Sequence, residues 1–333
     1  MPMPQSASPI NYRLGSLFAL ITAFLYSVQE PFSFPAARHF TTLQFVCLTQ
    51  IALLISIPLL MLRHPNSGRD FVALFRDGSN YGKLAVIFAV GMTGLLLYNF
   101  GLSNAHPIII SAILNLLPFW AALVALAIMK VPIPVSPAVF FGCFAGAFIG
   151  AMVVAWSQLD ASSKAASELV NSFLRGSWVY ALPVPLCSAL GGTLVGKWFA
   201  KYDESAAVAA QFFVANVVLI PATLVLLYER GELRFHSEFA AIILMIVGTI
   251  IAASVGRVFY QIGLTVTGGD NGFVSMFLNL VPALTALVSL VMSPWIADLH
   301  FAADPLFFVG LALIAASLFL FSWESWRQPA RPT

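Results

Sequence analysis

Charged residues are scarce in this sequence, and their scarcity excludes a soluble globule. Only 9% of the 333 residues are Asp, Glu, Lys or Arg, whereas soluble domains carry roughly 25%. Hydrophobic residues make up 60% of the chain, and the mean hydropathy is +0.91. This little polar surface cannot cover a particle in water, so we expect most of the chain to lie in lipid.

Motifs for metals, redox chemistry, nucleotides and nucleic acids are also missing. The three cysteines, Cys47, Cys143 and Cys187, lie in apolar runs without a Cys-x-x-Cys pair, and the five histidines show no metal spacing. The stretch GGTLVGK at 191–197 lacks the Ser or Thr of a phosphate-binding loop and lies in an apolar run. A net charge of +2 without a basic arm argues against nucleic-acid binding. We therefore expect no catalytic group, no metal and no cofactor.

Long apolar runs are abundant, and most approach the ~20 residues that a helix needs to cross the hydrocarbon core. The first run, 14–34, is longer than a signal-peptide core and has a poor cleavage site, so we expect it to be retained. We predict an all-α integral membrane protein with ten transmembrane helices. The predicted spans are 14–35, 41–62, 83–104, 107–129, 137–157, 175–199, 206–228, 239–264, 271–294 and 304–324.

The spans divide into two sets of five, separated by a polar linker. We predict an N-terminal tail at 1–13, a first five-helix repeat at 14–157, a linker loop at 158–174, a second five-helix repeat at 175–324 and a C-terminal tail at 325–333. Ten Lys and Arg residues fall on the side of the N-terminus and five on the other. The positive-inside rule then predicts that both tails are cytoplasmic, with the opposite orientation as the alternative.

The two sets of spans share sequence features, which indicates an internal duplication. The matched features are Gly15-Ser16 with Gly176-Ser177, Gln44-Phe45 with Gln211-Phe212, Tyr98 with Tyr260, Gly101-Leu102 with Gly263-Leu264, and Leu114-Asn115-Leu116 with Leu278-Asn279-Leu280. Each set has an odd number of spans, so the second set must enter the membrane in the opposite direction. The sequence therefore predicts two inverted repeats around a central cavity, an arrangement in which transporters bind solute near the bilayer midplane.

This organisation resembles the drug/metabolite transporter superfamily, in its ten-span EamA-type branch. The resemblance rests on the two five-span repeats, on Leu-x-x-Pro in the fourth and ninth spans and on the glycine-rich fifth span, and it covers roughly residues 14–325. It implies export or exchange of small metabolites, including amino acids, without ATP, across a bacterial-type cytoplasmic membrane. Many relatives carry a Gly-Glu pair after the fourth and ninth spans, where this chain reads IMKVPIP and VMSPWIA. We expect a small-molecule substrate, surrounding membrane lipid, and a monomer or homodimer.

A proline follows an asparagine at the same place in both repeats, as Asn115 with Pro118 and as Asn279 with Pro282. Proline has no N–H, so each leaves the carbonyl four residues earlier without its helical donor. In lipid that carbonyl needs another partner. We expect kinks that turn polar backbone and the two amides toward the cavity. The alternative is packing kinks whose asparagines bond between helices.

Two charged residues lie well inside predicted spans, where charge is costly and usually functional. Arg257 is expected to bind a substrate carboxylate or phosphate. The alternatives are an ion pair with Glu30, a cap on broken-helix carbonyls, or a side chain that snorkels to the membrane surface. Glu30 precedes Pro31 and Pro35, which are expected to break the first span near its outer end. Its carboxyl is expected to carry a coupling proton, or else to act as an outer gate or a lid over unpaired backbone.

Aromatic and amide side chains complete the candidate substrate site. The site comprises Tyr26, Glu30, Tyr98, Asn99, Asn115, Arg257, Tyr260, Gln261 and Asn279. A mostly apolar pocket with a few such groups suits an amphipathic solute. The alternative for any single ring is a position against lipid or at the membrane surface. Separately, Gly142, Gly146 and Gly150 share one helical face and are expected to let a neighbouring helix approach closely.

We therefore predict a secondary transporter that moves a small amphipathic, amino-acid-like metabolite by alternating access, and not an enzyme. One alternative is a carrier of anionic metabolites bound through Arg257. Another is a non-transporting membrane scaffold or receptor, which has no need of mirrored kinks or a midplane pocket. No convergent set of carboxylates, metal ligands or Ser/His pairs in the sequence points to an intramembrane enzyme.

Overall fold

Helices make up all the regular structure in the part of the chain that is described. The computed structural model describes residues 11–62, 65–133, 135–157, 175–233, 239–266, 274, 277–296, 299–300 and 304–327. No β-strand occurs within these ranges, which confirms the predicted all-α class. The predicted linker at 158–174 and most of both predicted tails lie outside the described residues.

Nine helical segments within the described ranges are long and apolar enough to cross a membrane. They are Tyr12–His39, Thr42–Met61, Gly78–Ser103, Pro107–Met129, Pro137–Ser157, Trp178–Phe199, Glu204–Glu229, Phe239–Gly263 and Pro305–Glu324. A shorter apolar helix, Val281–Met292, falls within the predicted span 271–294, part of which lies outside the described residues. Segments of this length and composition are those of an integral membrane protein.

Several spans contain more than one helical element. In chain order the elements are α1 (Tyr12–Ser27), α2 (Gln29–His39), α3 (Thr42–Met61), α4 (Ser67–Arg76), η1 (Gly78–Asn80), α5 (Tyr81–Asn104), α6 (Pro107–Leu114), α7 (Leu117–Met129), α8 (Pro137–Ser157), η2 (Ser177–Ala181), α10 (Val184–Phe199), α11 (Glu204–Glu229), α12 (Phe239–Ile250), η3 (Ile251–Gly256), α13 (Arg257–Val266), α15 (Val281–Met292) and α16 (Pro305–Arg327). The short helix α4 lies within a stretch that the sequence predicts as a connection.

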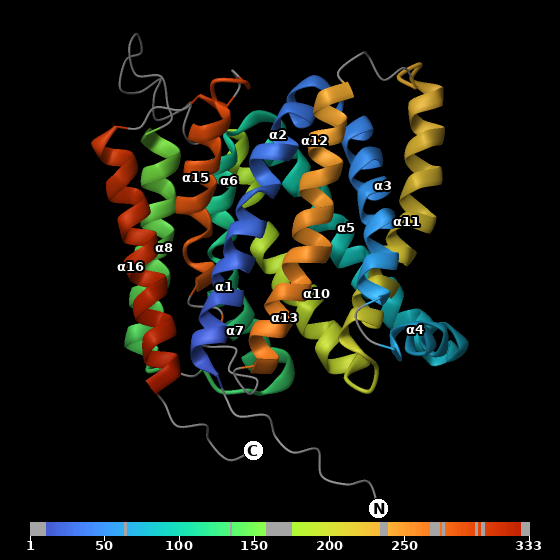
Figure 1. Cartoon of the computed structure of the whole chain (residues 1–333), viewed down its shortest axis with the longest axis horizontal. Coiled ribbons are helices and arrows are strands. Elements are labelled where there is room, and N and C mark those ends of the chain that lie inside the picture. Colours follow the sequence, from blue (N-terminus) through green and yellow to red (C-terminus); the bar gives the residue numbers. More distant parts are fainter. Residues whose placement is uncertain are drawn as a thin grey trace, which may run out of the picture.

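The long helices lie along roughly one direction and run alternately up and down the bundle (Figure 1). α1 begins and α16 ends at the same end, which is lower in Figure 1 and is called the lower end below. The opposite one is called the upper end. α4 lies at the lower end, where Asp70 accepts a hydrogen bond from the N–H of Asp203, immediately before α11 (2.9 Å).

The first span is interrupted at Val28, between α1 and α2. Pro31 has no N–H to donate to the carbonyl of Ser27, four residues earlier, so the helical hydrogen bond is missing there. The hydroxyl of Thr285 on α15 donates to that carbonyl instead (3.3 Å). Pro35 lies inside α2 without ending it. The interruption therefore lies closer to the middle of the span than the two prolines led us to expect.

Two further interruptions occupy equivalent places in the repeated motifs. A turn at Asn115–Leu116 separates α6 from α7, and a turn at Asn279–Leu280 precedes α15. The second residue of the turn has φ −75° and ψ −8° in the first case, and φ −80° and ψ −12° in the second. Pro118 and Pro282 each lie in the first turn of the following helix, where an N–H would have no partner within the helix. Both helices are thus interrupted just before their proline.

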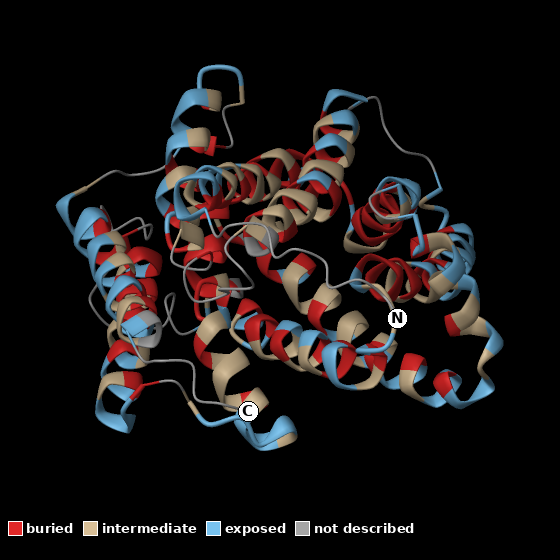
Figure 2. Cartoon of the chain, turned by 60° about the horizontal axis from the view of Figure 1, so that its bottom comes forward, coloured by how far each residue is buried: buried red, intermediate tan, exposed pale blue. Residues whose placement is uncertain are grey.

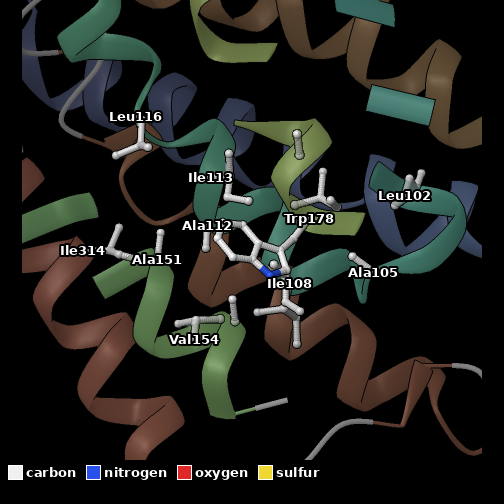
Figure 3. Close-up of a cluster of buried hydrophobic side chains, with 14 of the residues drawn as sticks. Leu102, Ala105, Ile108, Ala112, Ile113, Leu116, Ala151, Val154, Trp178 and Ile314 are labelled. Carbon is white, nitrogen blue, oxygen red and sulfur yellow. The ribbon is translucent and has the colours of Figure 1, made fainter. Parts of the chain in front are cut away.

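Large apolar side chains fill the space between many of the helices. The largest buried cluster draws on α2, α6, α8 and α16, and Trp178 of η2 lies within it beside Ile108 and Ile113 (Figure 3). Figure 2 shows buried positions gathered between helices and exposed positions on their outward sides. The outward positions include large apolar residues such as Val225 and Leu290. Exposed apolar area on this scale indicates contact with lipid.

α8 and α16 share the most extensive contact among the described helix pairs. A Cβ atom added at Gly150 would lie 2.7 Å from the carbonyl oxygen of Gly310, and one added at Gly310 would lie 2.8 Å from the carbonyl oxygen of Gly150. Gly146 faces Ser317 of α16, whereas Gly142 has open space beside it. Two of the three glycines in α8 therefore allow the close approach, and Gly142 does not take part.

Candidate functional site

A cavity of about 320 Å³ lies inside the helix bundle. Its lining residues are Tyr26, Gln29, Glu30, Ser111, Leu114, Asn115, Leu117, Pro118, Phe212, Ala252, Ala253, Arg257, Leu278, Asn279 and Val281. Ligand pockets in proteins commonly measure about 300–1,000 Å³, with mainly apolar walls and a few polar groups. The cavity fits the lower end of that range and has the same character.

Irregular helix geometry marks four of the walls. The lining residues flank the interruption at Val28 in the first span, the turn at Asn115–Leu116 and the turn at Asn279–Leu280. The fourth wall is η3, a π-helical turn between α12 and α13. Interrupted backbone at membrane depth is tolerated where it is buried in protein or lines a cavity, and π-turns occur frequently at functional sites. Four irregularities around one cavity therefore make this cavity the candidate ligand site.

Six of the eleven residues singled out from the sequence line this cavity. They are Tyr26, Glu30, Asn115, Pro118, Arg257 and Asn279. They come from the first, fourth, eighth and ninth predicted spans, so residues far apart in the sequence meet at one place. The sequence did not single out Gln29, Ser111 or Phe212 as part of the wall. Of these, Ser111 lies one helical turn before Asn115, so helical spacing alone could have found it, whereas Gln29 is adjacent to Glu30 and such neighbours do not share a helix face.

The other five predicted residues do not line the cavity. They are Tyr98, Asn99, Tyr260, Gln261 and Pro282. Tyr98 packs against the large apolar cluster, and its hydroxyl is buried. Asn99 is fully buried within the bundle on α5. Neither is a lining residue, and no other residue of α5 is one.

Arg257 forms an ion pair with Glu204, the first residue of α11 (2.6 Å). The amide of Gln261, one helical turn after Arg257, donates to the other carboxylate oxygen of Glu204. The two side chains of the ion pair are 37% and 45% exposed, so the pair lies at the open edge of the cavity. The sequence-based alternative of a pair between Arg257 and Glu30 is not what the structure shows. Glu204 was missed because it lies at the end of a span.

Glu30 is only 5% exposed, although it is a charged residue on the cavity wall. It lies in the first turn of α2, where the positive end of the helix dipole favours an acidic side chain. Its Oε2 atom is buried and has no hydrogen-bond partner among the described residues. The two charged side chains of the wall thus differ, because Arg257 has an ionic partner and Glu30 has none within the described ranges.

Three hydroxyl or carbonyl groups link three interrupted helices beside the cavity. Thr285 donates its single hydroxyl proton to the carbonyl of Ser27, so the hydroxyl of Ser111 is the donor to Thr285 (3.2 Å). All three residues are buried. The first, fourth and ninth predicted spans are therefore joined at their interruptions by polar contacts instead of by apolar packing alone.

The two asparagines of the repeated motif have different partners. Asn115 donates to the carbonyl of Ser111, within its own span (2.8 Å). Asn279 donates to the hydroxyl of Ser322 on α16 (3.4 Å). Both also line the cavity. Of the two sequence interpretations, bonding between helices applies to Asn279 and not to Asn115, while both amides border the cavity.

Comparisons with known proteins support the fold. No protein-family model matches the chain, and no curated protein matches it. A solved structure, described only as "Crystal structure of protein", matches 95% of this chain and 99% of its own chain, with a TM-score of 0.54 and 17% sequence identity. At this identity the likeness shows the fold alone. The arrangement of helices is therefore one that an experimental structure of similar extent also has.

Proposed function

We propose that the protein is a secondary transporter of a small amphipathic, amino-acid-like metabolite, of the EamA type within the drug/metabolite transporter superfamily. The observation that carries the proposal is the cavity at which four irregular helices meet. A carrier has to expose one site to two sides of a membrane in turn, and transporters built from repeats form that site from interrupted helices. A scaffold or receptor has no comparable use for them.

The proposed architecture is two inverted five-helix repeats, and the direction of equivalent spans supports it. The first span starts at the lower end, where the N–H of Asn11 donates to the carbonyl of Val266, and it ends at the upper end (2.9 Å; Figure 1). The sixth predicted span runs the opposite way. It ends at the lower end, where Lys197 donates to the carbonyl of Ile128 (3.1 Å). The equivalent turns at Asn115–Leu116 and Asn279–Leu280 add a second sign of duplication.

The proposed orientation places the lower end in the cytoplasm of a bacterial-type cell, with both tails there. The excess of Lys and Arg on that side supports it. The partly exposed Arg257–Glu204 pair lies where α11 begins, so the cavity is closest to water at the lower end. The structure then corresponds to an inward-facing form. Reporter fusions that place the two chain ends in different compartments would overturn this orientation.

Solute flux into proteoliposomes tests the function. Purified protein is reconstituted, loaded with a mixture of unlabelled amino acids, and assayed for uptake of the same compounds in radiolabelled form. Replacement of the cavity-lining Ala253 by Trp is expected to abolish exchange, because the new ring fills the cavity. Leu290→Trp, at a position 58% exposed on the outward side, is the matched control and is expected to keep it. Equal fluxes with the two variants, or no flux above protein-free liposomes for any solute, would refute the proposal.

A further inference from the structure

The charge on the cavity wall is unbalanced. Its charged side chains are Glu30 and Arg257. Arg257 is neutralised by Glu204, and Gln261 holds the same carboxylate. Glu30 has no cation within reach among the described residues, and its Oε2 is buried without a partner. When Glu30 is ionised, the group formed by these side chains carries one net negative charge, which is located at Glu30.

A buried carboxylate with an unpaired oxygen is costly, since the low-dielectric interior replaces little of the hydration that it loses. A ligand cation that donates hydrogen bonds to Glu30 removes this cost, whereas a ligand anion adds to it. Arg257 cannot attract an anion with its full charge while Glu204 neutralises it. The electrostatics of the wall therefore favour a positive group on the solute.

The rest of the wall favours an organic cation over an inorganic one. Leu114, Leu117, Phe212, Leu278 and Val281 supply apolar surface. Phe212 and Tyr26 also present aromatic rings, which attract ammonium groups through their π-electrons. No cluster of three or more His, Cys, Asp or Glu side chains that could hold a metal ion occurs within the described residues. A small solute with an ammonium head and an apolar body matches both the charge and the surface.

We propose that Glu30 binds the ammonium group of the solute, and that the cavity therefore selects small organic amines. A carboxylate on the solute is not required, because Arg257 is held by Glu204. The inference rests on the proposed function only in taking the cavity as the solute site. It changes the expected recognition, since the sequence placed Glu30 in the candidate site but assigned the charged group of the substrate to Arg257.

Equilibrium binding to the purified full-length protein in detergent tests the inference without any flux measurement. Three probes share a phenyl ring and a two-carbon chain: phenethylamine is a cation, phenylalanine a zwitterion and 3-phenylpropionate an anion. Wild-type protein is expected to bind phenethylamine and phenylalanine at least tenfold more tightly than 3-phenylpropionate. Tighter binding of the anion than of the amine would overturn the inference. Measurable solute flux together with equal binding of the amine and the anion would overturn the proposed role of Glu30 and leave the transporter proposal standing.

Charge-removing variants locate the recognition. Glu30→Gln keeps the shape of the side chain and is expected to weaken phenethylamine binding at least tenfold. Glu204→Gln releases Arg257 and is expected to strengthen 3-phenylpropionate binding several-fold. The double variant is expected to reverse the preference, so that the anion binds more tightly than the amine. Unchanged phenethylamine affinity in Glu30→Gln would show that this carboxyl does not bind the solute.

A measurement on unaltered protein covers the case in which Glu30→Gln does not fold. Dicyclohexylcarbodiimide modifies carboxyl groups in apolar surroundings, and mass spectrometry reports the modification at Glu30. Phenethylamine is expected to slow this reaction at least fivefold at saturating concentration, and 3-phenylpropionate is expected to leave it unchanged. Equal reaction rates with and without the amine would overturn the inference.

Discussion

The contact between α8 and α16 and the wall of the cavity use opposite means to pack helices inside a membrane. α8 and α16 are continuous helices of 21 and 23 residues, and their backbones touch at Gly150 and Gly310. The cavity is bordered by interrupted helices whose polar groups are joined by side chains such as Thr285. Where association depends on close packing alone, small residues and regular backbone serve best. Where a cavity must be kept open, the helices are interrupted. A carbonyl that loses its helical donor there, such as that of Ser27, accepts a hydrogen bond from a side chain instead.

The largest effect is expected where the helices touch most closely. Gly150→Leu places a side chain against the carbonyl oxygen of Gly310, 2.7 Å from the new Cβ atom. Overpacking of this kind costs about 1–3 kcal/mol, and more when backbone is the obstacle. We expect a large fall in the thermal midpoint of the detergent-purified protein. Gly142→Leu is the control, because nothing lies within 4 Å of its Cβ position. Equal midpoints for the two variants would contradict the described contact.

A substitution beside the cavity is expected to affect function more than stability. A Cβ atom at Gly256 would lie 2.7 Å from the ring of Tyr26, which lines the cavity. Gly256→Ala should displace that ring and lower flux about tenfold, the equivalent of about 1.4 kcal/mol. The change in thermal midpoint should be small, because a side chain moves instead of backbone. Gly192→Ala, with open space beside it on α10, is expected to keep full flux. Similar flux in both variants would count against a role for Tyr26.

A smaller effect is expected from the hydroxyl link. Thr285→Val keeps the shape of the side chain but removes the donor to the carbonyl of Ser27 and the acceptor for Ser111. Loss of a buried hydrogen bond costs about 1 kcal/mol, and more if a partner stays unsatisfied. Chemical denaturation should report this loss. Thr93→Val serves as the control, since its hydroxyl bonds only the carbonyl of Ala89 in an exposed position. An equal loss in the control would show that the link between spans adds nothing.

A pH dependence of stability is expected outside the spans. His106 precedes α6, where its Nδ1 accepts from the N–H of Ile108 and its Nε2 donates to the carbonyl of Leu299 (3.2 Å). Burial lowers the pKa of His106 to about 4, whereas an unfolded histidine titrates near 6.5. The unfolded chain therefore binds the proton first, so stability is complete above about pH 6.5 and falls as the pH drops toward 4.

His106→Asn tests this dependence, because Asn is a good residue at a helix N-terminus but does not titrate. The variant should lose less of its thermal midpoint between pH 7 and pH 5 than the wild-type protein does. The same slope in both proteins would exclude His106 as the source.

The sequence predicted where the helices lie along the chain better than it predicted which face of each helix turns toward the cavity. Apolar run lengths gave the helical spans, and the repeated Leu-Asn-Leu-x-Pro located two interruptions, because proline acts on its own backbone. The place of Tyr98 and Asn99 was not predictable. α5 is apolar on all sides, so no sequence pattern shows which face turns inward.

The partner of Arg257 was hidden for a different reason. Glu204 lies 53 positions away in sequence, at the start of another helix. Local spacing predicts which side chains share a helix face, but it does not predict which helix ends meet in space. Glu30 was found because a lone acid within an apolar run stands out, and its lack of an ionic partner became visible only with the neighbouring helices in place.

The hydrogen bond from Thr285 to the Ser27 carbonyl makes the interruption between α1 and α2 a hinge. Within a regular helix, each carbonyl has its donor on the same chain at a fixed distance, so bending breaks a bond. At this hinge the donor belongs to another helix and turns about a single side-chain bond, with Ser111 as its second neighbour. α1 and α2 can therefore change their mutual angle while the hydroxyl follows the carbonyl, so the carbonyl of Ser27 keeps its donor.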